Sequence, residues 1–375
     1  MSIMKQRYMV SGRIQCWCFI WTSAKVRSVN LRHSFLAALV AVLWGLNFVA
    51  IDFGLHANGR DVPPLLFVAM RFVLVVFPWI LFVRKPDVSW KAIIGVGLFM
   101  SAGQFGLLYL AMALGMPAGL ASLVLQAQVL LTVLLAAGFL GERPSRRQLA
   151  GVVLGVAGLA VVAVGRSAVA PVLPLIIVLG AALSWAAGNV IARKAKAASG
   201  LGLVVWSGAV VPLPLAGLSL IIDGPAAVVG TLADLQPATI VSALYTAVFA
   251  SLVGYGIWNR LLASYPSSAV VPFTLLVPVV GMSAAWLALG EVPTPAELAG
   301  GLFLLGGVAT AVLTGAGTRP QRREAALAPD LDGAFRVGLD AVAGAGLRTA
   351  DADDDGRLAS TAGTRAAGVR EPDVR

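Results

Sequence analysis

Arg71 stands near the middle of a long apolar stretch at residues 63–83, where a charged side chain needs an explanation. If that stretch crosses a bilayer, a charge near its centre costs about 2.5–3.5 kcal/mol, so the side chain requires a partner or a water-filled cavity. A guanidinium binds a carboxylate through two parallel hydrogen bonds, which predicts a site for the carboxylate of an amino-acid-like substrate. The alternative is structural: Arg71 would pair with Asp52, near the end of the preceding apolar stretch, or with backbone carbonyl groups.

Two other apolar stretches each carry a tryptophan and an asparagine on one helical face. Trp44 and Asn47 are three residues apart, and Trp185 and Asn189 are four apart, so the members of each pair share one side of a helix. Such faces could line a shared cavity, with the tryptophan as a wall and the amide as a hydrogen-bonding group. They could equally join helices, because an asparagine hydrogen bond between helices needs no ligand.

Gln126 and Gln128 lie in a further apolar stretch, and residues two apart point to different sides of a helix. Ser122 lies one turn before Gln126 on the same face, which makes Gln126 the better candidate for lining a cavity. Leu275 and Val277 stand at the matching positions of an internal repeat described below, so these amides occur in only one copy. A substrate with two distinct ends would need such asymmetry, and an amide that packs between helices would account for it as well.

The chain offers little for catalysis or for a metal site. Its two histidines, His33 and His56, lie at opposite ends of one apolar stretch, and its two cysteines, Cys16 and Cys18, lie in the N-terminal segment. Hydrolysis or group transfer within a membrane would need acids, bases or nucleophiles that face one another at depth. The sequence also lacks the nucleotide-binding motif G-x-x-x-x-G-K-[ST]. We therefore expect no catalytic residue, no metal and no cofactor.

The elements that position these residues follow from composition. Of the 375 residues, 58% are apolar and 12% are charged, against about 45–50% and about 25% in soluble domains, so most of the chain is expected to lie in lipid. Apolar stretches of roughly 20 residues are long enough to cross a bilayer as helices. The sequence predicts ten such spans, at residues 34–55, 63–83, 92–113, 118–140, 148–165, 172–192, 202–222, 237–259, 268–289 and 297–315.

The chain also repeats itself. The segment LGERPSRRQLAG around Gly141 returns as LGEVPTPAELAG around Gly290, a shift of 149 residues. Each copy holds five of the ten spans, and because five is odd, the second copy must enter the membrane from the opposite side. We therefore expect an all-α integral membrane protein with two inverted five-helix repeats, at residues 34–165 and 172–315.

Both ends of the chain differ from the repeats. Residues 1–33 form a basic tail, in which Val29 could be the true initiator, so that the preceding segment would be an extension of the start site. Residues 316–375 are rich in Ala, Gly, Asp and Arg and lack a sustained apolar period, which predicts a disordered tail on the cytoplasmic side.

The loop charges indicate the orientation in the membrane. Positive residues favour cytoplasmic loops, and alternate loops hold ten Lys or Arg against two. With a cytoplasmic N-terminus, the external loops hold only Arg60 and Arg166, and both termini are cytoplasmic. The net charge of +10 is thus spread over short loops, which argues against nucleic acid as a partner. The ten residues predicted to be cytoplasmic are Arg84, Lys85, Lys91, Arg143, Arg146, Arg147, Arg193, Lys194, Lys196 and Arg260.

The repeated Gly-Glu loops are typical of helix starts rather than of catalysis. Ser145 with Gln148, and Thr294 with Glu297, form the Ser/Thr-x-x-Gln/Glu pattern of a capping box. The glutamates Glu142 and Glu291 are therefore interpreted as parts of structural loops. Proline pairs in spans seven and nine predict kinks that could also act as gates, at Pro212, Pro214, Pro272 and Pro278.

Several phrases of the sequence resemble the EamA branch of the drug/metabolite transporter superfamily: LWGLNFVAI at 43–51, GMPAGLASLVLQAQ at 115–128, LSWAAGNV at 183–190, VGYGIW at 253–258 and LLVPVVG at 275–281. The resemblance runs from about residue 30 to about residue 315. It implies ten helices in two inverted halves, a bacterial inner membrane, cytosolic termini and export of cysteine and O-acetylserine. It brings no agreed set of functional residues.

The leading hypothesis is a secondary transporter that exports small amino-acid-related metabolites by alternating access. A membrane enzyme and a non-transporting membrane protein are the rivals from other classes, and an exporter of other amino acids or drug-like metabolites is the alternative within the class. The expected partners are a small-molecule substrate and the lipid bilayer, with the protein a monomer or a homodimer. The expected substrate path includes Trp44, Asn47, Arg71, Gln126, Trp185 and Asn189.

Overall fold

The computed structural model describes residues 30–56, 59, 61–167, 171–196, 200–265 and 267–313. The predictions for most of the N-terminal tail, for Arg60 and for the C-terminal tail therefore lie outside the described residues. Everything below concerns the part of the chain within these ranges.

The described residues are mostly helical and include ten helical segments that are long and apolar enough to cross a membrane. Each matches one predicted span, and each starts within three residues of the predicted start. The prediction of ten transmembrane helices is confirmed. We call spans one to five the first half of the protein and spans six to ten the second half.

The first half begins with one unbroken helix and continues with more divided spans. Span one is α1 (Leu31–Leu55), and span five is α7 (Arg146–Ser167). The three spans between them are composed of shorter segments, namely α2 (Pro64–Val76) with η2 (Trp79–Leu81), then α3 (Trp90–Val96), η3 (Gly97–Gly103) and α4 (Gln104–Ala113), then α5 (Ala118–Val124) and α6 (Ala127–Leu140).

The second half follows the same plan with one addition. Span six is α8 (Leu173–Lys194), and span ten is α16 (Pro295–Leu313). The sequence did not predict α11 (Pro225–Ala233), a short helix in the loop between spans seven and eight. The remaining segments are α9 (Leu201–Gly208) and α10 (Pro212–Ile222), then α12 (Pro237–Leu244), η4 (Tyr245–Val253) and α13 (Gly254–Ser264), then α14 (Ser267–Val270), η5 (Val271–Leu275) and α15 (Leu276–Leu289).

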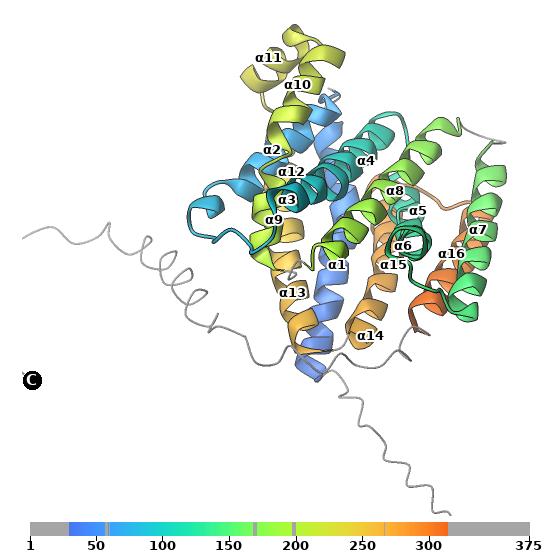
Figure 1. Cartoon of the computed structure of the whole chain (residues 1–375). Coiled ribbons are helices and arrows are strands. Elements are labelled where there is room, and N and C mark those ends of the chain that lie inside the picture. The colour runs from blue at the N-terminus through green and yellow to red at the C-terminus, as the bar shows by residue number, and fades with distance from the viewer. Residues whose placement is uncertain are drawn as a thin grey trace, which may run out of the picture. The chain divides into compact units, whose positions relative to one another are not determined.

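The opening helix of each half packs against the other half. The neighbours of α1 are chiefly α12, η4, α13 and α15 of the second half, whereas α8 lies against α3, η3, α4 and α6 of the first. Figure 1 shows α1 beside α13 and α15, and α8 beside α6. Three side chains of the second half also donate hydrogen bonds to backbone carbonyl groups of α1, from Thr239, Ser242 and Tyr245.

Spans three and eight, which correspond in the two halves, both contain a π-helical segment. These segments, η3 and η4, have wider turns than an α-helix, and π-helical turns occur often at functional sites. Each one accepts a hydrogen bond from the opening helix of the other half. The indole nitrogen of Trp44 donates to the carbonyl of Ala250 in η4 over 2.9 Å, and the hydroxyl of Ser184 donates to the carbonyl of Phe99 in η3 over 2.7 Å.

The last helices of the two halves, α7 and α16, lie side by side at the edge of the bundle in Figure 1. They pack closely through glycines. A Cβ atom on Gly151 would lie 2.5 Å from the carbonyl oxygen of Gly307, and one on Gly158 would lie 2.5 Å from that of Gly300. The repeat shift takes Gly151 to Gly300 and Gly158 to Gly307. The contact therefore maps onto itself when the two halves are exchanged, as expected for an inverted repeat.

The loops before α7 and α16 have the predicted capping boxes. The Ser145 hydroxyl accepts from the Gln148 amide while the Gln148 side chain accepts from the Ser145 amide, and Thr294 and Glu297 repeat this exchange. Gly141 and Gly290, which end α6 and α15, have φ values of 68° and 72°, a region that favours glycine. The Gly-Glu loops therefore have the structural role that the sequence predicted.

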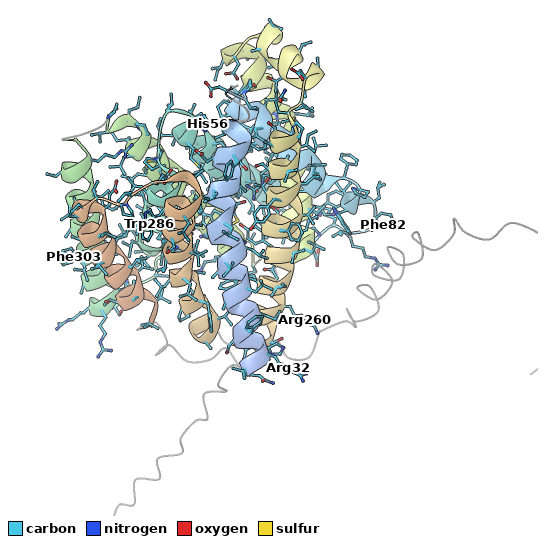
Figure 2. The ribbon with its side chains drawn as sticks, turned by 180° about the vertical axis from the view of Figure 1, so that it is seen from behind. Arg32, His56, Phe82, Arg260, Trp286 and Phe303 are labelled. Atoms are coloured by element: carbon cyan, nitrogen blue, oxygen red, sulfur yellow. The ribbon has the colours of Figure 1, made fainter. Side chains whose placement is uncertain are left out.

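The proline-containing spans are broken, in agreement with the predicted kinks. Pro212 is the first residue of α10 after the break at the end of α9, and Pro278 lies in the first turn of α15. Proline fits a first helical turn because an N–H group at that position has no acceptor within the helix, so the lack of an N–H group in proline costs no hydrogen bond. Figure 2 shows Arg32 and His56 at opposite ends of α1, with Arg260 at the same end as Arg32. The end of span eight thus lies on the face where span one begins.

Candidate functional site

Arg71 lies on α2 at the contact between the halves, and only 1% of its surface is exposed. One terminal guanidinium nitrogen donates to the Tyr109 hydroxyl over 3.1 Å, and the other donates to the Ser251 hydroxyl over 2.9 Å. Tyr109 belongs to α4 of the first half, and Ser251 belongs to η4 of the second. Ser251 in turn donates to the carbonyl of Thr246. The guanidinium is therefore held by neutral hydroxyl groups from both halves.

Within the described residues, no carboxylate lies within ion-pair distance of Arg71, and its Nε atom is buried without a hydrogen-bond partner. Neither partner named in the structural alternative, Asp52 or a backbone carbonyl group of the described residues, is bonded to Arg71. Asp52 instead lies 3.4 Å from the imidazole of His56, one helical turn away on α1. His56 is four residues after Asp52 and therefore lies within reach of the short Asp52 side chain. The Arg71 guanidinium, in the bundle interior, is not among the contacts of Asp52.

The ring of Phe105 connects Arg71 to Trp185. The guanidinium carbon lies 4.0 Å from the Phe105 centroid, a cation–π distance, and the Phe105 ring meets Trp185 edge-on at 6.3 Å between centroids. Phe72 packs against Phe105 at 5.6 Å. Aromatic faces stabilise a buried cation electrostatically while leaving its N–H groups free for other partners.

Trp44 approaches the same region from α1. Its indole bonds the carbonyl of Ala250, the residue before Ser251, and its ring packs against Tyr255 and Trp258 at 5.2 Å between centroids. Arg71 and Trp44 thus attach to adjacent residues of η4. The structure brings three predicted residues, Arg71, Trp44 and Trp185, into one connected set of contacts.

Two amide oxygens in the bundle interior have no partner. The side chains of Asn47 on α1 and Gln104 at the start of α4 are 6% and 1% exposed, and neither the Asn47 Oδ1 nor the Gln104 Oε1 atom accepts a hydrogen bond. A buried acceptor without a donor costs free energy on the order of 1–3 kcal/mol, so each is a candidate for binding a ligand. The sequence argument missed Gln104, although an isolated glutamine within an apolar span is the same signal that selected Gln126.

The remaining two predicted residues join helices. The Gln126 amide donates to the carbonyl of Thr274 over 3.1 Å, which connects span four to span nine. The Asn189 amide donates to the Thr132 hydroxyl over 3.4 Å, which connects span six to span four. Both bonds are consistent with the alternative in which amides hold helices together.

Arg166 is a second buried cation, at the end of α7. The sequence placed it in an external loop, but only 8% of its surface is exposed. It donates to the carbonyl of Gly115 over 3.1 Å and lies 4.0 Å from the carboxylate of Glu297. Unlike Arg71, it has an acidic neighbour.

No three His, Cys, Asp or Glu side chains of the described ranges form a cluster suited to a metal ion.

Comparison with known proteins finds relatives that are named as efflux pumps and exporters. A probable amino-acid metabolite efflux pump of Salmonella typhimurium (strain LT2) is 43% identical over 287 residues, which cover 75% of this chain and 94% of the relative. The protein of the same description from Escherichia coli (strain K12) has the same identity and coverage. A probable terminal-alkyne amino-acid exporter of Streptantibioticus cattleyicolor is 33% identical over 298 residues, or 76% of this chain and 94% of the relative.

A solved crystal structure has the same fold, with a TM-score of 0.50 at 21% identity, and the alignment covers 75% of this chain and 97% of that chain. The model of the EamA-like transporter family matches twice, at residues 31–164 and at residues 172–313. These two matches together span well over half of the sequence, and they agree with the ten helical spans. The chain therefore belongs to the EamA-like transporter family, and it is a multi-pass membrane transporter of small molecules.

Proposed function

We propose that this protein exports small amino-acid-related metabolites, with cysteine and O-acetylserine as the leading substrates, across a bacterial inner membrane by alternating access. Arg71 is the single observation that carries the proposal. It is a fully buried cation between the halves, with neutral hydroxyl partners and a free Nε–H group, and the described residues place no carboxylate beside it. A carboxylate on the substrate would complete that site through a charge-assisted hydrogen bond.

Two unpaired amide oxygens of the interior match the second end of an amino acid. Asn47 Oδ1 and Gln104 Oε1 are acceptors that lack donors, and an ammonium group offers three donors. A zwitterion would thus satisfy both the free guanidinium N–H and the free amide oxygens. Cysteine and O-acetylserine each carry these two groups, and Trp44 and Trp185 would act as apolar walls. Gln126 and Asn189 would keep the surrounding helices in place.

The arrangement of the halves supports alternating access. The two repeats, proposed at residues 34–165 and 172–315, enter the membrane from opposite sides, and Arg71 is held by one hydroxyl from each. A site between inverted halves can open to either face in turn. The loop charges support cytoplasmic termini. Relatives named as exporters of amino-acid metabolites support the outward direction of transport.

A second candidate function is the export of other amino acids. The guanidinium and the amide oxygens recognise groups that all α-amino acids share. They do not distinguish between substrates by the side chain of the amino acid. The relative named as a terminal-alkyne amino-acid exporter favours this wider range. Selectivity would then depend on the aromatic walls rather than on the polar atoms.

An efflux experiment tests the proposal. Cells that lack other exporters are loaded with labelled cysteine, O-acetylserine or a third amino acid, and efflux is followed with and without the protein and with a proton uncoupler. Arg71→Ala is expected to abolish efflux and Arg71→Lys to reduce it, because lysine lacks the planar fork. Arg193→Ala is the control, since it removes an exposed arginine. Full efflux by Arg71→Ala at normal protein level would exclude a carboxylate site at this residue.

A further inference from the structure

The carboxylate of Glu291, in the loop after α15, bridges the two halves. Its two oxygens accept hydrogen bonds from the backbone amides of Ala118 over 2.8 Å and Gly119 over 2.9 Å. These amides begin α5, where the first N–H groups of a helix lack partners within the helix. Negative charge is also favourable at a helix N-terminus. One side chain of the second half thus satisfies two amides of the first.

The helices beneath this contact are closely packed. A Cβ atom on Gly119 would lie 3.2 Å from the Cα of Met282 in α15, and one on Gly281 would lie 2.5 Å from the Ser122 hydroxyl. Ser122, one turn deeper in α5, is 1% exposed. Spans four and nine are therefore in close contact at these positions, on the membrane face that carries Glu291.

The repeat-related glutamate makes a different contact. Glu142, in the loop after α6, pairs with Arg193 at the end of α8 over 2.7 Å, and the two side chains are 46% and 51% exposed. The loop that holds Glu142 lies on the opposite face, because the two repeats are inverted. An exposed ion pair of this kind contributes little to stability. The two equivalent glutamates thus differ in what they hold, and only Glu291 is part of a tightly packed contact.

We propose that the Glu291 carboxylate is a latch that closes one face of the transporter, and that its release from Ala118 and Gly119 is required for that face to open. The inference rests on the proposed function, since it assigns a gate to alternating access. The loop charges predict that the latched face is the external one. The charged groups around the latch are Asp52 and Glu297, with Arg166 beside Glu297.

Accessibility of a cysteine below the latch tests the proposal. Ser122→Cys is introduced in a chain whose two native cysteines, Cys16 and Cys18, are replaced by serine. A membrane-impermeant maleimide is applied to right-side-out and inside-out vesicles, and its reaction rate is compared with and without Glu291→Gln. Glutamine keeps the shape but places an N–H donor against one of the two amides and removes the charge. In right-side-out vesicles, we expect the maleimide to label Ser122→Cys about tenfold faster when Glu291→Gln is also present than when Glu291 is kept. This is the size of effect that loss of a charge-assisted hydrogen bond gives.

Glu142→Gln is the matched control, because it makes the same change at the repeat-related residue on the other face, and it should leave labelling from the Glu291 face unchanged. Glu291→Asp keeps the charge but is too short to reach both amides, and intermediate labelling is expected. Equal labelling of native protein and both Glu291 variants would overturn the latch. Efflux is measured separately on the same vesicles. Increased labelling without transport of either substrate would contradict the substrate proposal and leave the latch intact.

Discussion

Gly151 in α7 lies so close to Gly307 in α16 that a Cβ atom on Gly151 would stand 2.5 Å from the carbonyl oxygen of Gly307 and 2.9 Å from the amide of Ala311. Both neighbours are backbone atoms, which cannot move aside as a flexible side chain can. Helices that associate in lipid depend on close backbone contact between small residues. The crossing of α7 and α16 therefore has no room for even one methyl group at this position.

Gly151→Ala is expected to destabilise the protein by about 1–3 kcal/mol, the usual cost of an overpacked contact. Thermal unfolding in detergent measures the effect as a lower Tm. Gly138→Ala in α6 is the control, because a Cβ atom there meets nothing within 4 Å. Alanine at a helical glycine with free space gains about 0.5–1 kcal/mol. A Tm for Gly151→Ala equal to or above that of Gly138→Ala would contradict the close crossing.

Ser251→Ala removes a hydrogen-bond partner of Arg71 without touching the guanidinium. The buried nitrogen that bonded the hydroxyl is left unpaired, and hydrogen bonds to charged groups are worth about 1.5–3 kcal/mol. We expect the concentration of substrate that gives half-maximal efflux to change about tenfold or more. Ser264→Ala, at the exposed end of α13 where the hydroxyl bonds the carbonyl of Arg260, should behave as the native protein. The same half-maximal concentration in both variants would remove Ser251 from the site.

Gln104→Leu tests the free amide oxygen in span three. Leucine has nearly the same size but cannot accept a hydrogen bond from an ammonium group, so efflux of amino acids should fall severalfold. Protein level and Tm should be kept or raised, because the variant also removes a buried unpaired acceptor. Gln128→Leu on α6 serves as the comparison, since Gln128 is only partly buried. Unchanged efflux by Gln104→Leu would show that this oxygen does not contact substrate.

The stability of the protein should depend on pH through Glu291. Burial beside α5 raises the pKa of this carboxyl above its ordinary value, hydrogen bonds from Gly119 and Ala118 offset part of the rise, and the charges of Asp52 and Glu297 add to it. The folded protein therefore binds the proton more tightly than the unfolded chain does. The stabilisation is fully present below the ordinary pKa of 4.5 and is lost as pH rises through the raised value.

Thermal unfolding of the native protein and of Glu291→Gln across this pH range measures the effect. The difference in Tm, native minus variant, should decrease from pH 4.5 upward and then become constant, because glutamine does not titrate. A difference in Tm that grows with pH would mean that the hydrogen bonds to α5 outweigh the cost of burying the charge.

The ten spans could be predicted because lipid imposes a simple requirement on a sequence, namely about 20 apolar residues for each helix. The capping boxes could also be predicted, since Ser145 and Thr294 form hydrogen bonds with residues three positions away in the sequence. Local spacing decides both features. Neither depends on which helices become neighbours.

The partners of the site residues could not be predicted, because they come from distant parts of the chain. Arg71 was recognised as unusual, yet its Ser251 partner lies 180 residues away, and a single serine in an apolar span is no signal by itself. The sequence pointed instead to Asp52, near the outer end of span one, or to backbone carbonyl groups, and Asp52 lies beside His56 one turn further along the chain. Glu291 was correctly placed in a structural loop, but its contact with α5 depends on how the halves meet.

The exchange of opening helices limits what a single half can do alone. Because α1 lies chiefly against the second half and α8 lies against the first, the unit that was duplicated is not the unit that packs. The arrangement is that of a domain swap carried out within one chain. A five-helix half made alone would leave its first helix without the carbonyl groups that accept the hydrogen bond from Trp44 or from Ser184. Such a half would need a second copy, inserted the other way round, to supply them.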